Sequence, residues 1–87
     1  MFANSNYNRA VAVTTSDVND LPDFQARGTL TNALYFGSNT GNAVVVFADG
    51  STATFKLIPQ GTILPLRARR VNATGTTSTD IVALYQL

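Results

Sequence analysis

Short apolar runs separated by turn residues recur along the chain, and no segment of ten or more residues has an apolar stripe with a helical period. The apolar runs predict strands over residues 10–13, 30–36, 43–48, 51–57, 63–71 and 81–85. Turn signals every 8–12 residues or so are typical of small antiparallel β-sandwiches and partly closed barrels. We therefore expect an all-β domain of about six strands. Residues 14–27 are expected to form a long loop, with one helical or 3₁₀ turn as the alternative, because Pro22 prevents a long helix.

The dipeptide Asp49-Gly50 lies between two apolar runs, which is a strong signal for a β-hairpin. With a two-residue turn, Val44 faces Phe55 and Val45 faces Thr54. Facing residues lie on the same side of the sheet. This register predicts a core face made of Val44, Val46, Ala53, Phe55 and Leu57.

The opposite face of this hairpin then carries Val45 and Phe47 beside Thr52, Thr54 and Lys56. A face turned to water would not need Val45 and Phe47. We expect these two residues to be covered, either by the 17–25 loop or the N-terminal segment, or by another protein. They are therefore candidate interface residues.

Two later strands also have a predicted place in the sheets. Pro65 cannot donate a hydrogen bond, so the strand over residues 63–71 is expected at a sheet edge or to carry a bulge. The strand over residues 81–85 is apolar at every position, which predicts that both of its faces are covered.

The first nine residues are polar and rich in asparagine. We expect residues 1–9 to form a flexible arm and residues 10–87 to form a single β-domain. Phe2 and Tyr7 are spaced as in an extended arm, and arms of this kind often become ordered on binding. Both are therefore candidate contacts with a neighbouring protein; the alternative is that the arm folds back over its own sheet.

Composition narrows the classes of function. The chain has 87 residues, of which 45% are apolar and only 13% charged, with a net charge of +1. Charged residues are about half as frequent as usual, which suggests that part of the surface is covered in an oligomer. Histidine and cysteine are absent, which removes the usual general base, the thiolate nucleophile and two common metal ligands. We therefore predict a protein that is not an enzyme and has no cofactor and no nucleic-acid or membrane partner.

Asp17, Asp20 and Asp23 follow one another at intervals of three residues. The series lacks the glycine and the final glutamate of an EF-hand loop. Local capping and turn hydrogen bonds are the favoured explanation, with a weak calcium site as the alternative, and we predict no metal site.

Arg67, Arg69 and Arg70 carry half of the positive charge. No glycine-rich phosphate loop and no interleaved aromatic residues accompany them, which disfavours phosphate or nucleic-acid binding. We expect them to protect a sheet edge or to form salt bridges with a neighbouring subunit.

Several ordered segments resemble a family of small virion proteins of tailed phages and gene transfer agents, of the head-spike base or head-decoration type. The resemblance covers residues 14–85, on LYFG at 34–37, Asp49-Gly50 with Thr54-Phe55, PQGT at 59–62, PLR at 65–67, RVNATGTT at 70–77 and IVALY at 81–85.

The resemblance implies a non-enzymatic virion protein on the capsid surface, assembled in the host cytoplasm, with the major capsid protein or a spike protein as partner. A homotrimer is expected, or a pentamer if the protein roots a spike at a five-fold vertex. No fibre extension follows Leu87, which favours a clamp or adaptor over host recognition. The alternatives are a tail, baseplate or fibre-adaptor subunit and, less in keeping with the few tyrosines and absent tryptophan, a free ligand-binding β-domain.

Overall fold

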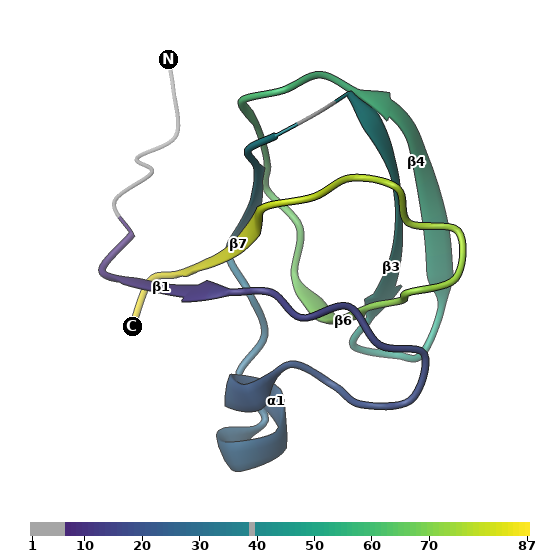
Figure 1. The fold of residues 1–87 in the computed structure, drawn as a ribbon. Coiled ribbons are helices and arrows are strands. Elements are labelled where there is room, and N and C mark those ends of the chain that lie inside the picture. The colour runs from purple at the N-terminus through teal and green to yellow at the C-terminus, as the bar shows by residue number, and fades with distance from the viewer. Residues whose placement is uncertain (1–6, 39) are drawn as a thin grey trace.

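The computed structural model describes residues 7–38 and 40–87, which form two antiparallel sheets packed face to face with one short helix (Figure 1). One sheet has four strands in the order β1-β7-β2-β5, and the other has three in the order β4-β3-β6. The elements are β1 (Arg9–Ala12), α1 (Pro22–Arg27), β2 (Ala33–Phe36), β3 (Gly41–Phe47), β4 (Thr52–Ile58), β5 (Thr62–Leu64), β6 (Ala68–Val71) and β7 (Ile81–Tyr85). The predicted all-β fold is confirmed as an open sandwich with seven strands.

The seventh strand arises because the segment predicted as one strand over residues 63–71 is two. β5 ends at Leu64 and β6 begins at Ala68, and the two belong to different sheets. Pro65 lies in the break, where its missing N–H removes no sheet hydrogen bond. β5 and β6 are each the last strand of their sheet, so the predicted edge position is confirmed.

The predicted hairpin at Asp49-Gly50 is confirmed, but its predicted register is wrong by one residue. The amide of Phe47 donates to the carbonyl of Ser51 at 2.8 Å, and the amide of Gly50 donates to the carbonyl of Phe47 at 2.9 Å. Gly50 has a φ of +88°. These features define a three-residue loop, a type I turn followed by a glycine bulge. Asp-Gly suits this loop as well as the two-residue turn.

The extra loop residue moves β3 relative to β4, so that Val45 pairs with Ala53 and Val44 with Thr54. A one-residue shift exchanges the two faces of a strand. Val45 is therefore fully buried in the core and Phe47 packs against it, whereas Val44 lies on the opposite face. The prediction that Val45 and Phe47 face away from the core is wrong.

The core lies between the sheets and is built from residues of both, among them Tyr85, Phe36, Leu34, Val45 and Val71. β7 lies between β1 and β2 in the four-stranded sheet. Three of its residues, Ile81, Ala83 and Tyr85, point into the core.

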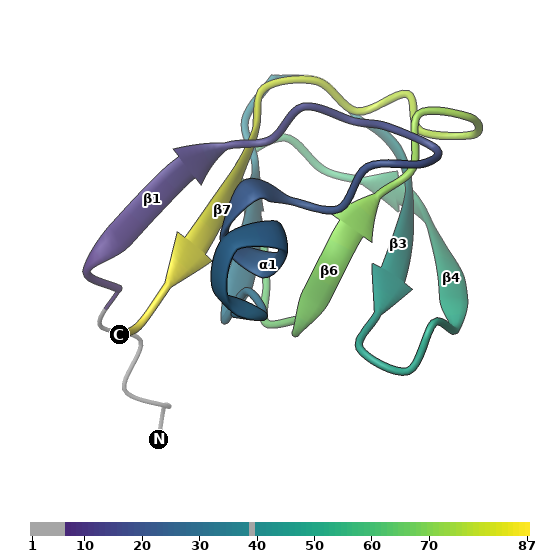
Figure 2. The same cartoon turned by 90° about the horizontal axis from the view of Figure 1, so that it is seen from below.

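Residues 14–27, expected as a loop, contain the six-residue helix α1. Pro22 occupies the first turn of α1, where proline is favoured, and Gly28 ends the helix in a left-handed conformation. In Figure 2, α1 lies across one side of the sandwich, between β7 and β6. The approach to α1 also covers the free edge of β6, because the amides of Ser16 and Leu21 donate to the carbonyls of Val71 and Arg69 at 3.0 and 2.8 Å.

The chain joins the domain earlier than expected. Arg9 opens β1, and the side chain of Asn8 exchanges two hydrogen bonds of 2.8 Å with the backbone of Leu87. Asn8 and Arg9 thus belong to the β-domain and not to the predicted arm. Phe2 lies outside the described residues.

Candidate binding surfaces

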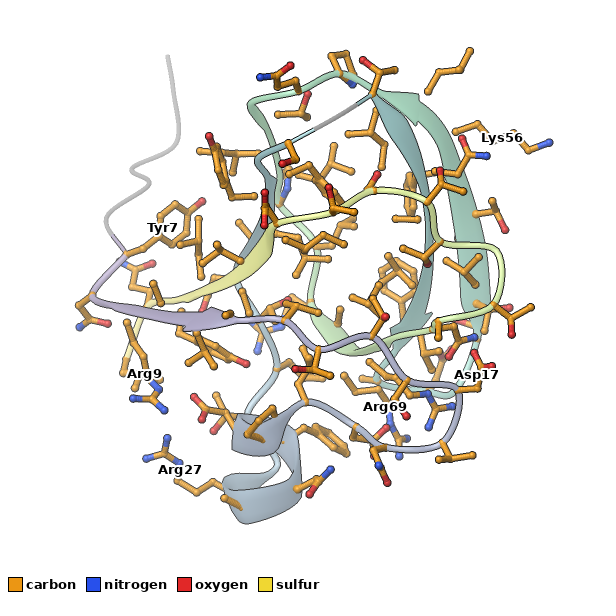
Figure 3. All side chains as sticks on the ribbon, in the orientation of Figure 1. Tyr7, Arg9, Asp17, Arg27, Lys56 and Arg69 are labelled. Carbon is orange, nitrogen blue, oxygen red and sulfur yellow. The ribbon has the colours of Figure 1, made fainter. Side chains whose placement is uncertain are left out.

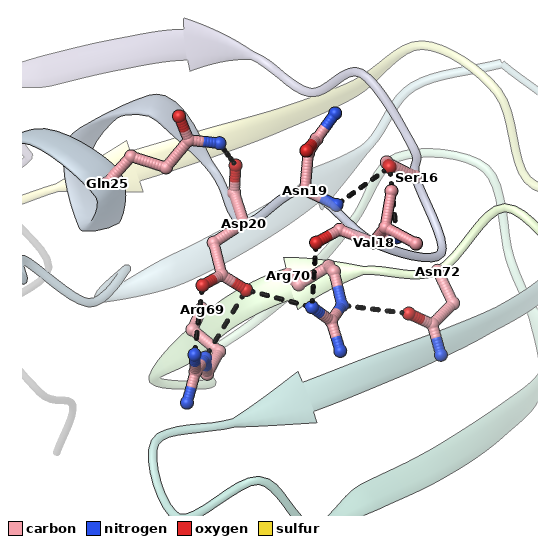
Figure 4. A network of polar contacts seen from close by, with 8 residues as sticks. All are labelled: Ser16, Val18, Asn19, Asp20, Gln25, Arg69, Arg70 and Asn72. Atoms are coloured by element: carbon pink, nitrogen blue, oxygen red, sulfur yellow. Dashed lines mark hydrogen bonds and ion pairs between the residues drawn. The ribbon is translucent and has the colours of Figure 1, made fainter.

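Asp20 is the centre of a polar network that joins the segment before α1 to β6 (Figure 4). Its carboxylate accepts hydrogen bonds from Arg69 at 2.9 and 3.3 Å and from Arg70 at 3.1 Å. Arg70 also donates to Asn72 at 3.1 Å, and Arg69 stacks 4.5 Å from the centre of the Phe24 ring. The hydrogen bond from Arg69 lowers the pKa of Asp20, and the charges of both arginines act in the same direction while desolvation opposes them. Both arginines therefore pair within their own chain.

Asp23 makes a second tie, between α1 and β1. Its buried carboxylate accepts hydrogen bonds from Arg9 at 2.6 and 2.9 Å and lies 3.4 Å from Arg27. Figure 3 shows Arg9 and Arg27 converging beside α1. The hydrogen bond from Arg9 lowers the pKa of Asp23, and burial raises the pKa of the neighbouring Tyr85. The ion pair between Arg9 and Asp23 holds α1 against β1.

Asp17 makes a third tie, to the loop before β7. It accepts hydrogen bonds from the amide and the hydroxyl of Thr74 at 2.9 and 2.6 Å, and these lower its pKa. The three aspartates thus bind three distant parts of the chain instead of capping their own segment. Within residues 7–38 and 40–87, no cluster of carboxylates could hold a metal ion. The spacing of the aspartates in the sequence carried no sign of these long-range partners.

Of the predicted interface residues, Val45 has no exposed surface. Phe47 and Arg67 come together at a shallow hollow beside the β3–β4 turn, which Leu30, Ala48, Asp49 and Ser51 complete. Arg67 is exposed there, and Tyr7, partly buried, precedes β1. Arg67 and Tyr7 remain candidate contacts.

A larger candidate surface is the side of the four-stranded sheet that faces away from the core. We call it the outer face; it consists of Ala10, Ala12, Ala33, Tyr35, Ile63, Val82 and Leu84. Leu84 pairs with Ala10 and Ala33, and Val82 pairs with Ala12 and Tyr35, so the face is continuous across the sheet. None of its side chains is charged. Ala10, Ala12 and Ile63 are exposed, Tyr35, Val82 and Leu84 are partly exposed, and Ala33 is fully buried.

The outer face contains Val82 and Leu84, the residues of β7 that do not point into the core. The apolar sequence of β7 predicted that both of its faces are covered. Its core-facing residues are buried, whereas Val82 and Leu84 keep part of their surface exposed in the single chain. The sequence signal for this surface was present in β7 but could not be combined with β1, β2 and β5 before the strand order was known.

None of the helices in the described part of the chain has the length and apolarity needed to cross a membrane. The fold and these surfaces define a small two-sheet β-sandwich with an uncharged sheet face.

No family model and no curated protein matches the chain. Among solved structures, the chain is similar to a chain in a structure described as the capsid of a native GTA (gene transfer agent) particle, computed with C5 symmetry. The identity is 34%, the TM-score is 0.76, and the match covers 92% of this chain and 84% of that one. The chain belongs to the same family as that protein of the gene transfer agent capsid structure. The resemblance found in the sequence is confirmed at this level.

Proposed function

We propose that this chain is a non-enzymatic structural protein of a phage or phage-like particle, which binds the capsid surface as a symmetric oligomer. It acts there as a cement (decoration) protein or as the base of a head spike. The observation that carries the proposal is the shared fold and 34% identity with a chain of the gene transfer agent capsid structure over most of both chains. Its partner is the major capsid protein or a spike protein.

The outer face supports self-assembly. A domain of this size has a small core, and oligomerisation commonly supplies the missing burial. Because the outer face carries no charge, copies of it meet without repulsion between like charges. We assign this face to contact between copies, in a trimer or, at a five-fold vertex, a pentamer.

The internal polar ties support a structural role as well. Asp17, Asp20 and Asp23 hold the 14–28 segment to the 72–79 loop, β6 and β1 respectively. Such ion pairs and hydrogen bonds stiffen a small domain, which is a structural role and not a catalytic one. The protein then serves as a rigid module with surfaces for assembly.

The first experiment measures assembly. Light scattering of the purified protein at micromolar concentration is expected to give the mass of three or five chains. Val82→Lys, in the middle of the outer face, is expected to reduce the mass to that of one chain. Thr54→Lys, on an exposed strand position of the other sheet, is the matched control and is expected to leave the mass unchanged. A stable wild-type monomer contradicts the proposed oligomer.

The second experiment identifies the partner by measuring binding to particle heads and to tails. Wild-type protein is mixed with particle heads purified without it, and separately with purified tails, and each mixture is sedimented. Saturable binding to heads supports the proposal. Binding to tails alone contradicts it and supports a tail or baseplate subunit instead.

A further inference from the structure

β4 carries a bulge close to its end, where two of its residues face one residue of β3. Gly41 pairs with Ile58 and Ala43 pairs with Phe55, so Lys56 and Leu57 together lie opposite Asn42. Leu57 has a left-handed backbone with a φ of +56°. The side-chain oxygen of Asn42 accepts a hydrogen bond from the Leu57 amide at 3.0 Å and holds this conformation.

The bulge reverses the sides to which the last two residues of β4 point. In a regular strand Leu57 would follow Phe55 toward the core and Ile58 would point outward. With the bulge, Ile58 is only 4% exposed, whereas Leu57 is 75% exposed. The sequence-based assignment of Leu57 to the core is therefore wrong.

A bulge here helps the chain to leave one sheet and enter the other, since β5 belongs to the four-stranded sheet. The passage from one sheet to the other does not explain why residue 57 is a leucine, because glycine would adopt the left-handed conformation without strain. The other described residues with positive φ are of types that tolerate it: Gly28, Gly50, Gly61, Gly75 and Asp80. Leu57 is the exception, and its strained backbone presents a large apolar side chain to solvent.

Lys56 precedes Leu57 and is the single lysine of the chain. It is exposed and projects from β4 away from the body of the domain in Figure 3. β4 lies across the molecule from β1 and β7, as Figure 1 shows. Lys56 and Leu57 therefore form a basic-apolar tip on the three-stranded sheet, whereas the outer face belongs to the four-stranded sheet.

We propose that the Lys56–Leu57 tip is the attachment point to the capsid shell: Leu57 inserts into an apolar pocket of a shell protein, and Lys56 pairs with a carboxylate at its rim. This rests on the proposed function and adds the residues and the chemistry of the contact. If two copies met tip to tip, their two lysines would repel each other, whereas a carboxylate of a shell protein would attract Lys56. The outer face belongs to the other sheet and stays available for contacts between copies.

The test uses the full chain and particle heads purified without it, with binding measured by sedimentation and folding by thermal unfolding. Leu57→Gly is expected to bind heads at least tenfold more weakly while its melting temperature does not fall, because relief of left-handed strain offsets the greater freedom of the unfolded chain. Leu57→Asn, which tolerates the same backbone, is expected to lose binding to the same extent. Lys56→Glu is expected to bind more weakly as well.

Val18→Ser is the matched control, because Val18 is 78% exposed and lies in the segment before α1. It is expected to bind heads like the wild type. Wild-type binding by both Leu57 variants overturns the proposed tip while leaving the capsid role intact. Failure of the wild-type protein to bind heads overturns the proposed function itself. Equal loss of binding in Val18→Ser and Leu57→Gly also overturns the tip, because any exposed apolar residue would then matter.

Discussion

The register of the β3–β4 hairpin can be tested with two neighbouring valines that differ in their side of the sheet. Val45 is fully buried in the core, and Val44 is partly exposed on the opposite face. The structure therefore predicts that Val45→Ala destabilises the domain much more than Val44→Ala. The register predicted from the sequence, with Val44 in the core, requires the opposite order.

The magnitude follows from the atoms removed. Truncation of a buried valine to alanine deletes two methyl groups, worth about 1.6 kcal/mol in transfer free energy, and leaves a small cavity in addition. We expect Val45→Ala to cost about 2–3 kcal/mol. Val44→Ala should cost about 1 kcal/mol or less. Both variants lose the same β-propensity in the same strand, so that contribution cancels in the comparison.

The assay is thermal unfolding at one fixed protein concentration, since assembly would make the melting temperature depend on concentration. A domain of this length loses about 4–8 °C per kcal/mol. Val45→Ala should therefore melt roughly 10–20 °C below the wild type, and Val44→Ala within about 8 °C of it. An equal or larger effect of Val44→Ala would refute the three-residue loop and the core face derived from it.

Three further predictions concern the polar ties and the turn. The pKa of Asp23 is lowered in the folded state, so its stabilising effect is present above the unfolded pKa of about 3.9 and is lost as the pH falls through the folded value. Asp23→Asn should therefore lower the melting temperature at pH 7. In a calorimetric series, the difference in melting temperature from the wild type should vanish at strongly acidic pH. Arg69→Lys should lower the melting temperature, because lysine cannot reproduce the two-point contact with Asp20 or stack on Phe24, whereas the exposed Arg67→Lys should not. Gly50→Val should cost about 1 kcal/mol or more in urea unfolding through backbone strain alone, since no atom lies within 4 Å of the added Cβ; a smaller cost would contradict the left-handed turn.

Much of the fold follows from local sequence. Glycine, proline and the Asp-Gly pair mark the ends of most strands, and the strand over 81–85 agrees with β7 at both ends. In β4, threonines alternate with Ala53 and Phe55, and this part of its inner face was predicted correctly. The alternation works because one side of that strand faces water.

In β3 there is no such alternation of polar and apolar residues, so the pattern cannot tell the inner face from the outer one. Val44, Val45 and Val46 are consecutive and apolar, so either face could have been the inner one. The hairpin loop decides which face is buried, and Asp-Gly is compatible with loops of two and three residues. The choice depends on packing against the other sheet, where Val45 meets residues far away in the sequence.

The sequence by itself determined the class of fold, the positions of most turns and the lack of histidine and cysteine chemistry, because these depend on residue type and short-range pattern. Only the tertiary structure decided the register of β3 on β4, the division of residues 63–71 between two sheets, and the pairing of Asp17, Asp20 and Asp23 with distant partners. It also decided that Leu57 points to solvent while Ile58 is buried. The reason is that register, strand order and long-range ion pairs depend on contacts between different segments of the chain, which no local pattern specifies. A short-range apolar pattern is the same whichever partner it meets.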